Sequence, residues 1–136
     1  MDTRRRRAFE FRLDTQSGVP VYRQLIDQVN GALASGMLVP GDRLPTVRQV
    51  AVDLSINPNT VIRAYRELEI RGALDSQQGT GTFVRKGEIK PDEVDRQRRL
   101  DQIITDFVAR AGAAGFTIAD LVYELQQRQG TPGEPI

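Results

Sequence analysis

The feature that most constrains this fold is a break of about three residues, at 55–57, between two short amphipathic segments. The spacing of apolar residues predicts helices over 46–54 and from 58 to about 71. Two helices joined this tightly have the spacing of a helix-turn-helix. The apolar faces comprise Val47, Val50, Ala51 and Leu54 in the first helix and Val61, Ala64, Tyr65 and Leu68 in the second.

The residues at the starts of both helices support this reading. Thr46 with Gln49 three residues later forms a capping-box pattern, in which each side chain bonds the other's backbone N–H. Asn57 is a preferred N-cap, and Pro58 suits the first helical position because its missing N–H would be unpaired there. Both helix starts are therefore encoded locally.

The flanking segments complete a winged helix-turn-helix. An amphipathic helix is predicted from Pro20 to a stop at Gly36, and Arg43-Leu44 leaves room for only a token strand. Two short strands, 73–77 and 82–85, enclose a Gly-rich hairpin tip at 78–81. The predicted fold is mostly α with a small β-hairpin, followed by a two-helix C-terminal dimerisation segment.

The C-terminal part offers two amphipathic helices, from about 91 to 111 and from Thr117 onward, separated by a Gly/Ala break at 112–115. Their apolar stripes can pack on the chain's own winged domain, or they can pair with the same helices of a second subunit, which we favour. The predicted dimerisation residues are Leu100, Ile103, Ile104, Phe107, Val108, Ile118, Leu121, Val122 and Leu125, with Ala111 continuing the first stripe.

These features give five predicted regions: a basic mobile arm (1–8), a winged helix-turn-helix domain (9–86), a linker (87–90), a helical dimerisation domain (91–129) and a disordered tail (130–136). The arm contains four consecutive arginines, Arg4 to Arg7. Such a run can contact DNA phosphates or a minor groove, or it can remain a solvated tail.

In a helix-turn-helix the second helix of the motif lies in the major groove, where its early residues reach base edges. Here these residues are Asn57, Asn59, Thr60 and Arg63. Asn can pair with adenine and Arg with guanine, whereas Thr can contact either a base or a phosphate. Each residue also has a structural explanation, since Asn57 can cap the helix and the others can be solvated side chains.

The preceding helix and the hairpin supply further candidates. Arg48 lies near the start of the helix that crosses the DNA backbone, next to Thr46. Arg43 is suited to a phosphate contact or to an ion pair with Asp42 or Asp53. Glycines at the hairpin tip permit close backbone approach to DNA or serve only the turn. The candidate DNA-binding residues here are Arg43, Thr46, Arg48, Gln78, Gly79, Thr80 and Gly81.

Composition argues against an enzyme or a metal protein. The chain has no Cys and no His, so the commonest general base, the thiol nucleophile and the usual transition-metal ligands are missing. We predict no cofactor, no metal, no membrane span and a cytoplasmic location. Residues 1–86 carry 13 Lys and Arg against 9 Asp and Glu, whereas residues 87–136 carry 6 against 9, so the N-terminal part favours an anionic partner.

Three runs, residues 40–51, 57–69 and 79–84, closely resemble the DNA-binding domain of GntR-type bacterial regulators. The Asn-Pro-Asn-Thr form at 57–60 and the short C-terminal part resemble the YtrA subfamily. The resemblance implies a dimeric winged helix with DNA contacts in its two helices and its wing, at Arg48, Asn57, Asn59, Thr60, Gln78, Gly79, Thr80 and Gly81. Many relatives carry Arg in the first turn of the recognition helix, where this chain has Pro58.

These observations predict a sequence-specific transcription regulator, a repressor that binds an inverted-repeat DNA operator as a homodimer. The alternative is a winged-helix module for protein–protein interaction without specific DNA binding. Two C-terminal helices are too little chain to enclose much of a small-molecule pocket, so binding of an effector stays open.

Overall fold

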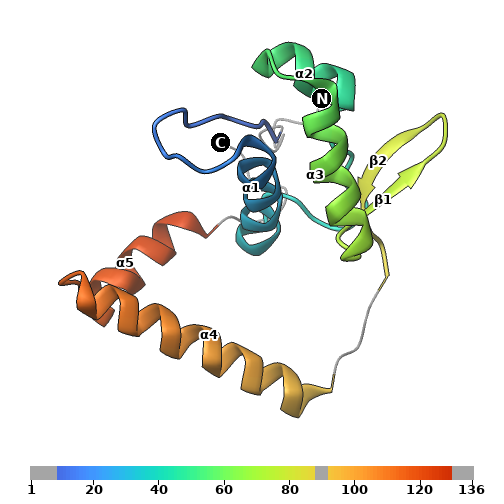
Figure 1. Cartoon of the computed structure of the whole chain (residues 1–136). Coiled ribbons are helices and arrows are strands. Elements are labelled where there is room, and N and C mark those ends of the chain that lie inside the picture. Colours follow the sequence, from blue (N-terminus) through green and yellow to red (C-terminus); the bar gives the residue numbers. More distant parts are fainter. Residues whose placement is uncertain (1–8, 88–91, 130–136) are drawn as a thin grey trace, which may run out of the picture. The chain divides into compact units, whose positions relative to one another are not determined.

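The computed structural model describes residues 9–87 and 92–129, which form two compact units (Figure 1). The predicted arm at 1–8, most of the linker and the tail from Gly130 lie outside the described residues. The first unit contains α1 (Val21–Ser35), α2 (Val47–Leu54), α3 (Pro58–Ile70), β1 (Leu74–Gln77) and β2 (Gly81–Val84); the second contains α4 (Glu93–Ala113) and α5 (Ile118–Arg128). The predicted fold, mostly helical with one hairpin, is confirmed.

The core of the first unit forms where α1 and α2 pack against α3. Every residue of the predicted α3 stripe is buried, as are Val50 and Ala51 of α2. Helix α1 buries Leu25, Ile26, Val29 and Ala32. The largest fully buried side chains are Leu25, Ile26, Val29, Leu44, Val61, Leu68 and Leu74.

Two glutamines of α1 hold the segment that precedes the helix. The Gln28 side chain accepts a hydrogen bond from the Arg12 backbone N–H (2.8 Å) and donates one to the Arg12 carbonyl. The Gln24 side chain pairs with both backbone groups of Asp14 in the same way. Two side-chain amides thus take the place of a neighbouring strand and fix this extended segment, whose Phe11 reaches the core.

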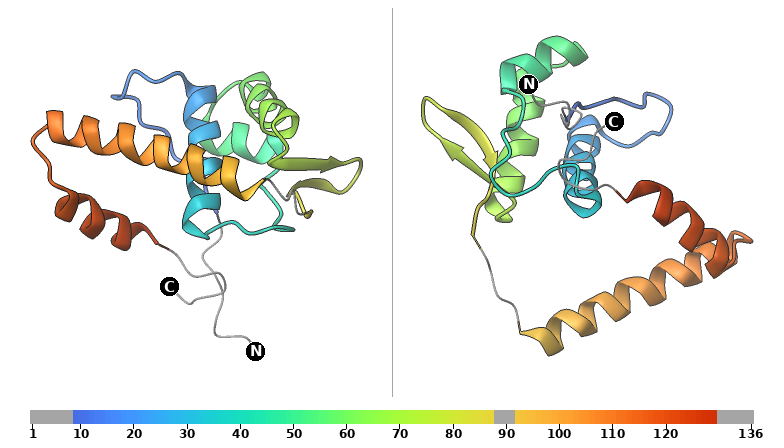
Figure 2. Two further views of the ribbon diagram at one scale, coloured as in Figure 1. Left: turned by 90° about the horizontal axis from the view of Figure 1, so that it is seen from below. Right: turned by 180° about the vertical axis from the view of Figure 1, so that it is seen from behind.

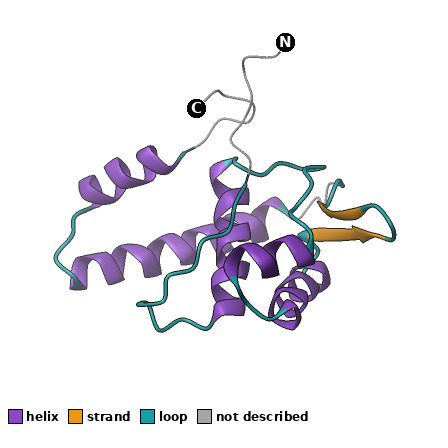
Figure 3. Ribbon diagram, turned by 90° about the horizontal axis from the view of Figure 1, so that it is seen from above, coloured by secondary structure: helices purple, strands orange, loops and turns teal. Residues whose placement is uncertain are grey.

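The strands β1 and β2 form an antiparallel hairpin that extends away from the three helices (Figures 2 and 3). The free edge of β2 pairs with residues 42–44, which precede α2. Leu44 N donates to Thr82 O (2.8 Å), and Val84 N donates to Asp42 O (2.8 Å). Arg43 forms a single bridge with Phe83, as expected for a token strand. This pairing fixes the hairpin, hereafter the wing, to the helical body.

Three local predictions were wrong in detail. Gly81 belongs to β2 and pairs with Gln77, so the wing tip is only Gln78–Thr80. Helix α4 continues two residues past its expected end at 111, because Gly112 costs only about 1 kcal/mol inside a helix and Ala113 is a strong helix former. The capping box of α2 is half formed: Thr46 Oγ1 accepts from Gln49 N (3.1 Å), but the Gln49 side chain bonds Asp53.

The second unit is a helical pair in which α5 folds back from the end of α4 (Figure 1). Asp92 caps α4, and Glu93 and Asp95 lie in its first turn, where the helix dipole favours acidic side chains. Helix α5 begins with a complete capping box between Thr117 and Asp120, in agreement with the helix expected from Thr117 onward.

Candidate nucleic-acid interface

The outward face of α3 is polar in its first turn. The N-cap Asn57 accepts a hydrogen bond from the Asn59 backbone N–H through Oδ1 (2.8 Å). The structure therefore shows the capping role of Asn57, which leaves its side-chain NH2 group for an outside partner. Asn59 itself is exposed, while Thr60 is half-buried.

Arg63, the next residue along this face, makes a contact that the sequence did not predict. Its guanidinium lies 3.7 Å from the centre of the Tyr22 ring of α1. A cation held over an aromatic face gains electrostatic attraction from the ring quadrupole. In this state the Arg63 charge is drawn toward α1, and a base contact would require the side chain to leave the ring.

A buried tyrosine connects α3 to the start of α2. The Tyr65 hydroxyl donates a hydrogen bond of 2.6 Å to the Pro45 carbonyl, immediately before the N-cap Thr46. Burial raises the pKa of the Tyr65 phenol well above its ordinary value. The neutral hydroxyl thus fixes the N-terminus of α2, where Arg48 is exposed in the first turn.

The wing candidates divide between its tip and its base. Gln78, Gly79 and Thr80 are exposed at the tip, where Gly79 has a φ of 77°. At the base, the Arg43 guanidinium carbon lies 6.0 Å from the Phe83 ring centre. Gly81 has a φ of 132°, and a Cβ there would lie 3.1 Å from Arg43 Nε. Arg43 therefore belongs to the wing rather than to α2, and the close approach at Gly81 is to this arginine.

Two exposed residues of α3 were absent from the predicted site. Arg66 is one turn beyond Arg63, and Ile62 is one turn beyond Asn59 with 37% of its surface exposed. The helical spacing of Asn59, Arg63 and Arg66 could have indicated Arg66. Ile62 was passed over because an apolar residue is ordinarily assigned to the core.

The predicted dimerisation residues form exposed stripes in the single chain. Ile103 is 63% exposed, and Leu100, Ile104, Phe107, Ile118, Val122 and Leu125 are also exposed, whereas Val108 and Leu121 are half-buried. Ala111, which continues the α4 stripe, is buried and accepts a hydrogen bond from Phe116 N at the turn into α5 (2.9 Å). An apolar stripe of this length is unusual on a monomeric surface.

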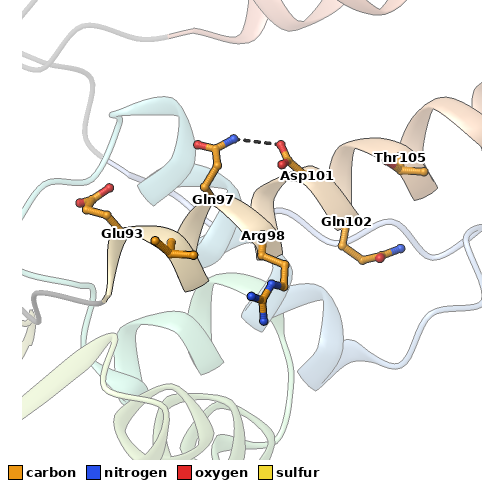
Figure 4. A pocket seen from close by; sticks show the side chains of 7 residues that line it. Glu93, Gln97, Arg98, Asp101, Gln102 and Thr105 are labelled. Atoms are coloured by element: carbon orange, nitrogen blue, oxygen red, sulfur yellow. Dashed lines mark hydrogen bonds between the residues drawn. The ribbon is translucent and has the colours of Figure 1, made fainter.

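A depression along the first half of α4 is lined by side chains of that helix alone, including Glu93, Arg98 and Thr105 (Figure 4). The Gln97 side chain donates to Asp101 across one turn (2.9 Å). Side chains from one helix cannot enclose a ligand, so this depression offers no binding site.

The described residues contain no group of three acidic or other ligating side chains that could hold a metal ion. Within 9–87 and 92–129, no helix is both long and apolar enough to cross a membrane.

A helix-turn-helix with a fixed wing and an exposed polar recognition face defines a class, the DNA-binding transcription regulators of winged-helix type. The family described as "Bacterial regulatory proteins, gntR family" matches residues 21–84. The chain is 36% identical over 108 residues to the transcriptional regulator YhcF of Bacillus subtilis, covering 79% of this chain and 88% of that protein. The chain belongs to the GntR family.

Two other relatives match mainly over the winged unit. The B. subtilis transcriptional repressor YtrA is 42% identical over 72 residues, 53% of this chain and 55% of YtrA. The regulator Rv1152 of Mycobacterium tuberculosis is 45% identical over 73 residues, 54% of this chain and 60% of Rv1152. The matched part thus spans little more than half of each of these proteins, and these relatives are regulators rather than enzymes.

Solved structures share the fold. A transcriptional antiterminator from Listeria monocytogenes superposes with a TM-score of 0.69 at 24% identity, covering 91% of this chain and 96% of its own. YtrA from Sulfolobus acidocaldarius, a GntR-family transcription factor, is 33% identical with a TM-score of 0.54, covering 73% of this chain and 97% of its own. The family and the fold are therefore established by independent comparisons.

Proposed function

We propose that this protein represses transcription by binding an inverted-repeat DNA operator as a homodimer. The observation that carries the proposal is the capped, exposed first turn of α3, which presents Asn59 on a rigid helix. An exposed Asn can donate to and accept from adenine at once, which is a sequence-specific contact in the major groove.

Phosphate contacts would fix the helix in the groove. Arg48 and the N-terminal N–H groups of α2 would bind DNA phosphates. Arg43 and the wing tip would contact neighbouring phosphates of the DNA backbone. The Arg63 side chain, which stacks on Tyr22 in the free protein, would leave the ring to contact DNA. Arg66 adds a further exposed cation on the same helix.

The second copy of the chain would be held by the apolar stripes of α4 and α5. A two-fold pairing buries one stripe against the same stripe of the partner, which makes the interface self-complementary. It would also place two recognition helices about 34 Å apart, one turn of DNA, and so require an operator with inverted symmetry. We propose repression because the relative YtrA is a transcriptional repressor. A regulator that binds bacterial operator DNA would act in the cytoplasm.

Selection of bound duplexes from a random DNA pool tests the proposal. The expected result is one enriched motif with two inverted half-sites. Asn59→Ala should weaken binding to that motif by about 5- to 150-fold, whereas Asn30→Ala, an exposed Asn on α1, should leave it unchanged. An unenriched pool would contradict specific binding and favour a protein–protein module instead.

Light scattering combined with size exclusion tests the dimer separately. Phe107→Glu places a charge in the α4 stripe and should yield a monomer at concentrations where the native chain is a dimer. Ala109→Glu adds the same charge on the opposite side of α4 and should leave the dimer intact. A dimer that survives Phe107→Glu would place the interface elsewhere.

A further inference from the structure

One large aliphatic side chain is exposed within the first two turns of the recognition helix α3, in addition to Pro58 at its start. Ile62 follows Val61, which is fully buried, but 37% of its own surface faces solvent. It lies one turn after Asn59 and therefore projects from a neighbouring part of the same outward face. In a regulator that places this face in the major groove, Ile62 would be close to the base edges.

The neighbours of Ile62 define the side of α3 on which it lies. Glu69, seven residues later on the same side of the helix, bonds the Ser76 hydroxyl of β1. Arg63, which follows Ile62, turns the other way and stacks on Tyr22 of α1. The wing side of the second turn is thus occupied by a branched apolar side chain, while the arginine charge is held on the α1 side.

We infer that Ile62 reads the 5-methyl group of a thymine in each half-site, an inference that rests on the proposed function. Thymine is the only one of the four standard bases with an apolar group on its major-groove edge. An isoleucine makes no hydrogen bond and would leave the polar edges of other bases without a partner. Its β-branched side chain is stiff in a helix, so contact with a methyl group costs little side-chain entropy.

Position separates Ile62 from the other exposed apolar residues of the two helices. Val52 lies near the end of α2 and Ile70 at the last residue of α3, and both are more exposed than Ile62. Neither lies in the first two turns of α3, which are the part that enters the groove. Isolated apolar residues on a surface are ordinary, so Val52 and Ile70 need no functional explanation.

The test replaces single thymines of the selected operator with deoxyuridine, which removes the methyl group and keeps the base pair. Binding of each duplex is measured with the full chain and with Ile62→Ala, Ile62→Val and Ile70→Ala, after circular dichroism has shown that each variant is folded. The native protein should lose about fourfold in affinity at one thymine of a half-site, the equivalent of about 0.8 kcal/mol for one methyl contact.

Ile62→Ala should bind the native operator more weakly and lose less than about twofold on the same substitution, because the partner of the methyl group is gone. Ile62→Val should retain most of the discrimination, and Ile70→Ala should match the native protein. If Ile62→Ala responds to deoxyuridine as the native protein does, or if no thymine position responds, Ile62 does not read a methyl group. A protein that enriches no motif at all would instead refute the proposed function, and this inference with it.

Discussion

Replacing Tyr65 with phenylalanine removes one oxygen from the junction between α3 and α2. The side chain is 3% exposed, so the ring should keep its place in the core. The change deletes only the 2.6 Å hydrogen bond to the Pro45 carbonyl. Because Pro45 is half-buried, water can replace part of that bond, and we expect a loss of about 1 kcal/mol in the free energy of unfolding at neutral pH.

The difference in the free energy of unfolding between the native protein and Tyr65→Phe should also depend on pH. Burial raises the pKa of the Tyr65 phenol, whereas in the unfolded chain the phenol ionises at its ordinary pKa of about 10. The protonated Tyr65 phenol therefore contributes fully to the free energy of unfolding below about pH 10. As the unfolded chain ionises this phenol, the native protein loses about 1.4 kcal/mol of that free energy by pH 11. Tyr65→Phe has no such group, so the difference in stability should vanish between about pH 10.5 and 11.

Urea unfolding of both proteins from pH 7 to pH 11 measures this difference directly. Tyr22 and Tyr123 are present in both proteins, so the comparison isolates the effect of Tyr65. The reasoning would be refuted by equal stabilities at pH 7, or by a difference that stays constant up to pH 11.

Three further predictions concern local features. Asn57→Ala should lower the free energy of unfolding by about 1 kcal/mol, measured in urea, because a backbone N–H of α3 loses its acceptor, and Asn57→Asp should restore it. Gly81→Ala should cost at least about 1 kcal/mol in thermal unfolding, since the new Cβ meets Arg43 at a strained φ, whereas Thr80→Ala should be nearly neutral. Backbone and side-chain hydrogen bonds from Thr117 lower the pKa of Asp120, so the amides at the start of α5 should lose protection from hydrogen exchange, relative to the unfolded chain at the same pH, as pH falls below about 4, and Asp120→Asn should remove that dependence.

Local chemistry made much of the fold predictable. The caps at Thr46, Asn57 and Thr117 lie where the sequence indicated, since a cap depends only on residues within one turn. The buried α3 stripe followed from spacing alone, because a helix turns by a fixed angle per residue. The end of α4 was predicted two residues too early, since Gly112 costs only about 1 kcal/mol inside a helix that alanine favours.

The candidate site was less predictable, because its geometry depends on contacts between elements. Nothing near Arg63 in sequence indicates that Tyr22, in another helix, takes its guanidinium. The bond from Tyr65 to Pro45 likewise joins residues 20 positions apart. The token strand at Arg43 was predicted, but only strand pairing shows that it lies against Phe83 of the wing. Sequence patterns identify which residues share a face, but only packing shows which faces meet.

The central claim, that α3 reads a DNA sequence, is tested most directly by titrating the native protein and Asn59→Ala with the selected operator and with a scrambled duplex of equal composition. The measurement is repeated at several salt concentrations, because phosphate contacts weaken with salt on both duplexes. The account predicts that the native protein binds the operator at least about 1,000-fold more tightly than the scrambled duplex, and that Asn59→Ala loses affinity for the operator alone. Equal affinities of the native protein for the two duplexes would contradict it.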